Sequence, residues 1–132
     1  MIVTRILIID DETPVRAFVR QTLEEEGYQI SEAADGEEGL AALRTLPADL
    51  IITDIFMPNK EGIETICAVR RHFPSVKILA ISGGGNYRID MLPAAMHLGA
   101  HHALTKPFTP DELLAAVNVA LTRKYLFSFS QD

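Results

Sequence analysis

Short apolar runs alternate with longer amphipathic segments along the whole chain. The apolar runs have the length of strands, and they predict strands at roughly 5–10, 28–33, 49–54, 76–81 and 102–105. The intervening segments carry apolar residues at helical spacing, and they predict helices at roughly 13–26, 36–46, 61–72, 90–98 and 110–123. Strand–helix units in unbroken succession predict an α/β fold, with a parallel sheet that helices cover on both faces.

The predicted strands differ in polarity, and this difference orders the sheet. The runs at 5–10, 49–54 and 76–81 are nearly continuous in apolar residues, as strands buried on both faces are. The run at 28–33 mixes polar with apolar residues and the run at 102–105 is short, so we expect these two at the edges. With right-handed crossovers, the expected order is 2-1-3-4-5 in a doubly wound sheet. The winding then reverses between the first and third strands, where a crevice opens at their carboxyl ends.

The predicted helix ends carry recognisable capping residues. Thr109 suits an N-cap before a proline at the first position of the fifth helix, and Asp35-Gly36 turns the chain into the second helix. Gly27 and Gly99 stand where the first and fourth helices should end. These signals agree with the element boundaries that the apolar pattern predicts.

Acids, a hydroxyl and an amine follow four of the apolar runs. They are Asp10 and Asp11 after the first run, Asp54 at the end of the third, Ser82 after the fourth and Lys106 after the fifth. Because parallel strands end at one edge of a sheet, we expect these side chains to line one pocket. Carboxylate oxygens without sulfur or histidine beside them suit Mg²⁺ rather than zinc. An aspartate beside Mg²⁺ can attack phosphorus and become an acyl phosphate, with Ser82 and Lys106 binding the phosphoryl oxygens.

Composition narrows the class of protein. The chain has 132 residues, of which 48% are hydrophobic, so it fits one domain with a core that needs no disulfide. The formal net charge of −6 argues against non-specific binding of nucleic acid. We found no stretch near the roughly 20 apolar residues that span a bilayer, and no signal peptide before the first strand. We therefore expect a cytoplasmic protein with no membrane insertion and no nucleic-acid binding within this chain.

The chain resembles the receiver domains of two-component response regulators over about residues 4 to 123. The resemblance rests on Asp10-Asp11, on Asp54 with Met57-Pro58 and Gly62, on Ser82, and on Lys106-Pro107-Phe108. Each of these features is common alone, but the whole set in this order, each at a strand end, is specific. The resemblance implies a flavodoxin-like fold and a receiver domain at 1–123. The C-terminal tail at 124–132 is too short for an output domain, so we expect either a stand-alone receiver or a fragment of a longer protein.

The resemblance also implies a role for each acid of the set. Asp54 is implied as the phosphoacceptor. Asp11 would ligate Mg²⁺ directly, Asp10 would help through water, and the backbone carbonyl of Phe56 would be a further ligand.

The remaining members of the set, and the partners, follow by the same resemblance. Ser82 and Lys106 would bind the phosphoryl group, and the Lys106–Pro107 peptide is expected to be cis, which X-Pro bonds permit. The phosphodonor would be a sensor histidine kinase or a histidine phosphotransfer protein. A conformational change would then relay the signal to a downstream protein, with the receiver acting as a monomer or as a phosphorylation-dependent homodimer.

The chain departs from the family pattern at the residues that usually transmit the signal. Ala103 stands where several receivers carry an aromatic residue that turns inward on phosphorylation, and Ser82 lacks the methyl group of the commoner threonine. We expect the glycine-rich loop with Gly83, Gly84 and Tyr87 to move instead, because glycines give it wide conformational freedom.

Phe56 bears on the rate at which the acyl phosphate is hydrolysed and on whether the protein is an aspartyl-nucleophile enzyme. Its bulky side chain, two residues after the acceptor, should exclude attacking water, so we expect slow loss of the phosphoryl group. A phosphatase or mutase with an aspartyl nucleophile usually has a second acid at this position, and Phe56 argues against that class. We thus expect a protein that promotes its own phosphorylation and dephosphorylation but is not a metabolic enzyme.

Two non-enzymatic alternatives are also open. A flavin-binding electron carrier would need hydroxyls and glycine after the first strand, where Asp10-Asp11-Glu12 would repel a phosphate. A receiver that serves only as an unphosphorylated binding module would not need the intact acceptor set. Separately, His101 and His102 suggest no metal site, because adjacent strand residues point to opposite faces.

Overall fold

A computed structural model describes residues 2–55, 61–83 and 92–123 of the chain. Its strands are β1 (Arg5–Ile9), β2 (Gln29–Ala33), β3 (Leu50–Asp54), β4 (Lys77–Ser82) and β5 (His102–Thr105). Its helices are α1 (Thr13–Glu24), α2 (Gly36–Thr45), α3 (Glu61–His72), α4 (Leu92–Leu98) and α5 (Pro110–Thr122). Each predicted strand and helix is present, with ends within about two residues of the prediction, the usual uncertainty of element boundaries.

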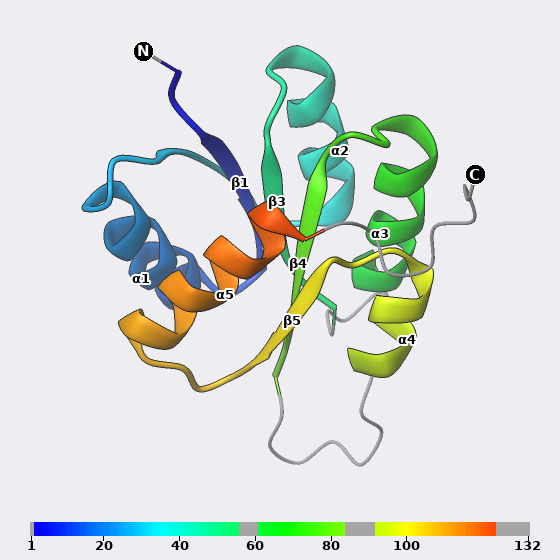
Figure 1. Cartoon of the computed structure of the whole chain (residues 1–132). Helices are drawn as coiled ribbons and strands as arrows, with labels where there is room; N and C mark the ends of the chain where they lie inside the picture. Colours follow the sequence, from blue (N-terminus) through cyan, green and yellow to red (C-terminus); the bar gives the residue numbers. More distant parts are fainter. Residues whose placement is uncertain (1, 56–60, 84–91, 124–132) are drawn as a thin grey trace.

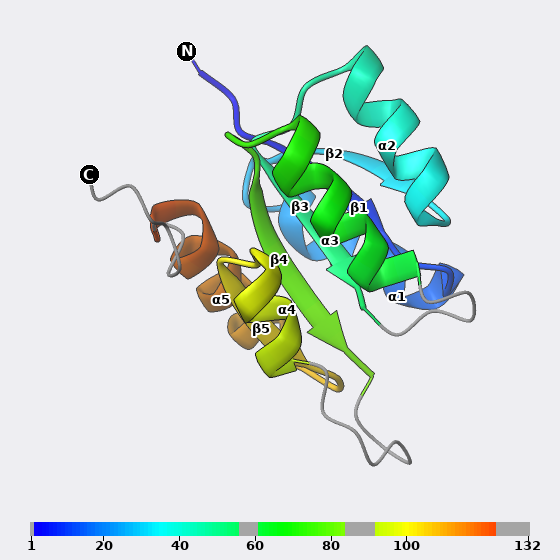
Figure 2. The same ribbon diagram turned by 90° about the vertical axis from the view of Figure 1, so that its right-hand side faces the viewer.

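The strands form one parallel sheet in the order β2-β1-β3-β4-β5, which confirms the predicted topology. Helices α1 and α5 cover one face of the sheet, and α2, α3 and α4 cover the other (Figures 1 and 2). The apolar β3 lies at the centre with all its residues buried, while the more polar β2 and the short β5 form the edges. The fold therefore follows directly from the polarity of the strands.

The core lies in two layers, one on each face of the sheet. Alternate residues of β1 point to opposite faces, so that Ile6 and Ile8 join the layer under α1 and α5, whereas Leu7 and Ile9 join the layer under α2, α3 and α4. This division explains why the central strands are apolar at every position rather than at every second one.

The predicted helix ends are confirmed where the structure describes them. The side chain of Asp35 accepts a hydrogen bond from the backbone N–H of Glu38 at 2.8 Å. Thr109 and Glu112 form a reciprocal capping box at the start of α5. Gly27 and Gly99 have φ values of +92° and +137°, a backbone region that favours glycine.

Several expectations fall on residues outside the described ranges. They concern Phe56, Gly84, Tyr87 and the tail 124–132. Among the described residues, no helix has both the length and the apolar character to cross a bilayer.

Candidate functional site

Two aspartates meet at the carboxyl end of the sheet. Asp54 is the last residue of β3, and Asp10 directly follows β1, its neighbour in the sheet. The pairing of Ile9 with Thr53 brings the ends of the two strands level. Both aspartates are buried, with only 2% of Asp10 and 3% of Asp54 exposed. Buried carboxylates need a partner of opposite charge, and here the partner comes from the end of β5, the edge strand that lies beyond β4.

That partner is Lys106, which directly follows β5. Its Nζ atom lies 2.8 Å from Oδ2 of Asp54, 3.1 Å from Oδ2 of Asp10 and 2.7 Å from Oε1 of Glu12. An ammonium group has three hydrogens to donate, so these three acceptors use all of them. The Lys106–Pro107 peptide is cis, as expected from the sequence.

Burial and the neighbouring charges shift the pKa values of Asp10 and Lys106. Burial raises the pKa of Asp10, and the charge of Asp54 adds to this rise, against the lowering effect of the Glu12 N–H and of Lys106. Burial alone would lower the pKa of Lys106, but hydrogen bonds to Asp54 and Glu12 and the charges of Asp54 and Asp10 outweigh it and raise that pKa. Lys106 is therefore a fixed positive charge among the carboxylates.

The turn that carries Asp10 is held by its own neighbours. Oδ1 of Asp10 accepts a hydrogen bond from the N–H of Glu12 at 2.8 Å, and its carbonyl oxygen accepts one from Nη1 of Arg16 at 2.6 Å. Nε of Arg16 also donates to Glu32 on β2 at 3.0 Å. The pKa of Glu32 is lowered, chiefly by a hydrogen bond from Arg20 and also by that from Arg16. These bonds orient the carboxylate of Asp10 toward Lys106.

Gly62 lets α3 approach the end of β3. A Cβ atom at this position would collide with the backbone of Ile55 and with the carbonyl oxygen of Asp54. Glycine is therefore required for the close contact between the first turn of α3 and the strand end that carries Asp54. Gly62 belongs to the sequence pattern that carried the resemblance, and the contact gives it a physical reason.

The acidic group has the chemistry of a site for a hard divalent cation. Carboxylate oxygens of Asp10, Glu12 and Asp54 lie within 4.8 Å of one another. Oxygen ligands in such a cluster suit Mg²⁺. Asp11 and Glu12 are both exposed, and of the two it is Glu12 whose carboxylate lies in this cluster. The role predicted for Asp11 stays a prediction.

Three further predicted residues lie within the described ranges, namely Ser82, Gly83 and Ala103. Ser82 is the half-buried last residue of β4, and its carbonyl oxygen accepts a hydrogen bond from the N–H of Lys106 at 2.8 Å. Gly83 follows it and is half-buried. Ala103 lies farther back, in β5, where it pairs with Ala80 of β4.

Sequence reasoning assigned no role to Glu12 or Arg16, yet both contact the site. Glu12 was visible only as the third member of an acidic run. Arg16 lies four residues later, the spacing that puts two residues on the same side of a helix. That spacing was the available signal, and it does not say which acceptor the arginine finds.

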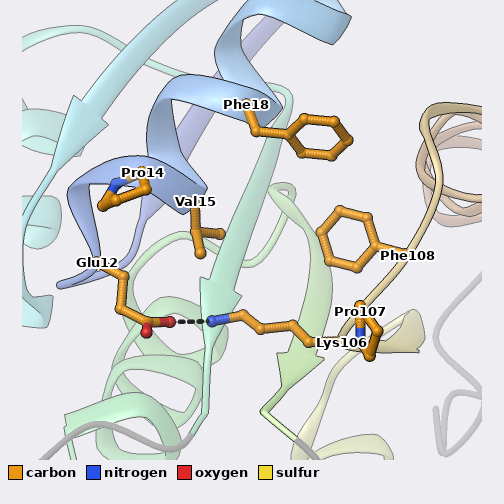
Figure 3. Close-up of a pocket in the computed structure, with 7 residues that line it drawn as sticks. All are labelled: Glu12, Pro14, Val15, Phe18, Lys106, Pro107 and Phe108. Carbon is orange, nitrogen blue, oxygen red and sulfur yellow. Dashed lines mark hydrogen bonds and ion pairs between the residues drawn. The ribbon is translucent and has the colours of Figure 1, made fainter.

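An apolar groove opens beside the cluster (Figure 3). It has a volume of about 420 Å³ and is lined by Glu12, Pro14, Val15, Phe18, Lys106, Pro107 and Phe108. The rings of Phe18 and Phe108 lie 6.0 Å apart between centroids. Phe18 keeps 37% of its surface exposed although helical spacing puts it on the apolar side of α1. Its exposed ring forms part of the groove wall rather than of the core.

A buried acid pair with a lysine, at the carboxyl end of a sheet wound 2-1-3-4-5, is the arrangement that the resemblance to receiver domains implied. Comparison with known proteins agrees: the chain belongs to the response regulator receiver domain family, which it matches over residues 6–118. A phosphoacceptor role fits this family, and the aspartyl-nucleophile phosphatase alternative is not favoured.

Individual relatives support the same assignment. The chain is 33% identical to the alkaline phosphatase synthesis transcriptional regulatory protein PhoP of Bacillus subtilis, over 97% of this chain and 52% of that protein. It is 38% identical to the KDP operon transcriptional regulatory protein KdpE of Escherichia coli, over 91% of this chain and 52% of that protein. The chain thus spans about half the length of these two curated relatives. The solved structure of chemotaxis protein CheY4 of Vibrio cholerae matches with a TM-score of 0.81 at 31% identity, over 90% of this chain and 99% of that one.

Proposed function

We propose that Asp54 accepts a phosphoryl group from the phosphohistidine of a sensor histidine kinase or histidine phosphotransfer protein. The observation that carries the proposal is the 2.8 Å contact between Oδ2 of Asp54 and Nζ of Lys106, inside a buried acidic cluster at the carboxyl end of the sheet. A buried carboxylate held by one lysine is fixed in position, and phosphoryl transfer depends mostly on positioning and electrostatics.

The transfer needs few groups. A carboxylate oxygen of Asp54 forms a new P–O bond while the P–N bond to the donor histidine breaks, and the electron pair leaves with the imidazole. The positive charge of Lys106 stabilises the charge on the phosphoryl oxygens, and the hydroxyl of Ser82 donates a hydrogen bond to one of them. The product is an acyl phosphate on Asp54.

The carboxylates also supply a site for Mg²⁺. The proposed ligands are Asp10, Asp11 and Asp54, with the backbone carbonyl of Phe56. The clustering of carboxylate oxygens from Asp10, Glu12 and Asp54 supports a divalent cation here. When bound, Mg²⁺ neutralises charge on the transferring phosphoryl group and orients it.

Signalling would follow from a change in conformation rather than from turnover of a metabolite. With Ala103 in place of an aromatic residue, the proposal keeps the loop of Gly83, Gly84 and Tyr87 as the moving part. The output would be a contact with a downstream protein in the cytoplasm, made by the monomer or by a phosphorylation-dependent homodimer. The bulk of Phe56 would keep the acyl phosphate long-lived by excluding water.

The experiment is incubation of the chain with acetyl phosphate and Mg²⁺, followed by intact-mass measurement. We expect the wild type to gain the mass of one phosphoryl group and Asp54→Asn to gain none. Asp49→Asn is the matched control, because Asp49 lies just before β3 at its other end and bonds the backbone N–H of Arg5 at 2.8 Å. Phosphoryl uptake by Asp54→Asn at the wild-type level would overturn the proposal.

A further inference from the structure

Glu12 differs from the other two acceptors of Lys106 in its exposure to water. Its side chain is 58% exposed, whereas the side chains of Asp10 and Asp54 are 3% and 4% exposed. We propose that Glu12 is a releasable tether: it holds the ammonium group of Lys106 in the unphosphorylated chain and gives way to a phosphoryl oxygen on Asp54. The proposal rests on the proposed function of Asp54.

All the hydrogens of the Lys106 ammonium group are already in use. Its three N–H groups already donate to Asp10, Glu12 and Asp54, at 3.1, 2.7 and 2.8 Å. A phosphoryl group on Asp54 brings new charged acceptors next to this nitrogen. One of these oxygens can take the hydrogen that Lys106 now gives to Asp54, and Lys106 can bind a second oxygen only if it leaves Asp10 or Glu12.

Release from Lys106 costs more at Asp10 than at Glu12. Asp10 is buried, so a hydrogen bond that its carboxylate loses to Lys106 cannot be replaced by water, which is unfavourable. Glu12, once released, regains water at its exposed carboxylate, and exposed ion pairs contribute little stability. Glu12 is therefore the acceptor that the phosphoryl oxygen replaces at the lowest cost.

Release of Glu12 would also change the charge at the protein surface. Glu12 and Lys106 both line the apolar groove, and the bond between them is the polar contact drawn across its edge in Figure 3. In the unphosphorylated chain this edge is an ion pair. After phosphorylation it carries a free carboxylate, while the ammonium group is held at Asp54. The groove beside α1 thus changes its charge with the state of Asp54.

The experiment compares Glu12→Asp and Glu12→Gln with the wild type, using beryllofluoride with Mg²⁺ as the phosphoryl mimic. Aspartate keeps the charge, but its side chain is shorter by one C–C bond of about 1.5 Å and loses the 2.7 Å contact to Lys106. Glutamine keeps the length and loses the charge. Glu25→Gln is the matched control, since Glu25 is exposed at the far end of α1. Thermal unfolding and Mg²⁺ affinity are measured for every variant.

A tether predicts that both Glu12 variants bind the mimic about threefold to fivefold more tightly than the wild type, because no ion pair has to break. Val15 methyl and Phe108 ring NMR signals should shift when the wild type binds the mimic. In free Glu12→Asp they should already lie part of the way to the bound position. Glu25→Gln should match the wild type in both measurements.

Three results would overturn the tether. Tighter binding in Glu12→Gln alone would mean that only the field of the carboxylate matters. Weaker Mg²⁺ and mimic binding in Glu12→Gln would make Glu12 a metal ligand instead. Wild-type affinity in both variants, with unchanged groove signals, would leave Glu12 without a role. A wild type that binds no mimic at all would instead refute the proposed function, and the tether with it.

Discussion

The two ends of the sheet each bury polar groups, but they balance them differently. At the amino end, His101 is 3% exposed. Its ring Nδ1 accepts a hydrogen bond from the backbone N–H of Ile78 at 3.0 Å, and its backbone N–H donates to the carbonyl of Ile78 at 2.7 Å. Close by, Nζ of Lys77 donates to the carbonyl of Arg123 at 2.8 Å. These side chains form hydrogen bonds with backbone groups, so the polar groups at this end stabilise the fold.

At the carboxyl end the charges do not balance. Carboxylates of Asp10, Glu12 and Asp54 share the ammonium group of Lys106, which leaves a formal excess of negative charge. Such an excess is costly in an apolar surrounding and invites a further cation. Buried polar groups alone therefore do not mark a functional site in this fold. An uncompensated charge at the end of a strand does mark one.

The largest expected effect is that of removing the balancing charge. Lys106→Met leaves Asp10 and Asp54 unpaired, and we expect the free energy of unfolding to fall by about 4 kcal/mol without Mg²⁺. Addition of Mg²⁺ at 100 times its dissociation constant should restore about 2.7 kcal/mol. Urea unfolding with and without Mg²⁺ measures both values.

The control for this substitution is the lysine at the other end of the sheet. Lys77→Met loses one hydrogen bond to a backbone carbonyl, so we expect about 1 kcal/mol and no response to Mg²⁺. Equal losses in the two variants, or no Mg²⁺ effect in Lys106→Met, would break the contrast between the two ends.

The next effect belongs to the amino end and depends on pH. Burial, and then the charges of Lys77 and Arg70, lower the pKa of His101 from 6.5 to about 4. Protonation therefore favours the unfolded chain, so stability is full above pH 6.5 and falls between pH 6.5 and 4. The shift corresponds to a loss of about 3 kcal/mol at pH 4.

His101→Asn isolates this loss, because asparagine offers an oxygen to the Ile78 N–H but does not titrate. We expect its stability to fall less than that of the wild type between pH 6.5 and 4, when both are followed by urea unfolding. His72→Asn, at an exposed position on α3, should keep the wild-type profile. If the free energy of unfolding of His101→Asn fell with pH in parallel with that of the wild type, the buried neutral imidazole of His101 would not be the cause of the loss.

The architecture was predictable because each strand shows its place in the sheet through its own amino-acid composition. The apolar β1, β3 and β4 and the more polar β2 show their place in the sheet by composition alone, and the sheet order is confirmed. Asp10, Asp54 and Lys106 were predictable for the same reason, since parallel strands end at one edge and bring these residues together.

Glu12 and Phe18 were harder because their roles depend on contacts. Nothing in the acidic run says that Glu12 rather than Asp11 reaches Lys106, because this depends on how the turn into α1 is held by Arg16. Helical spacing places Phe18 on the apolar side of α1, but it does not say that Phe108 lies opposite as the wall of a groove. Both features follow from how distant segments pack.

The smallest expected effect tests the carboxyl end without altering any charge. Gly62→Ala puts a methyl group against the backbone of Ile55 and the carbonyl of Asp54, so we expect about 2 kcal/mol lower stability and weaker binding of beryllofluoride. The matched control is Gly99→Ala, whose new methyl group meets the side chain of Arg70 at the other end of the sheet. It should lose stability and keep its affinity, because its collision leaves the end of β3 in place. If Gly62→Ala bound the mimic as tightly as the wild type, the position of Asp54 would not depend on the close approach of α3, and charge alone would distinguish the two ends of the sheet.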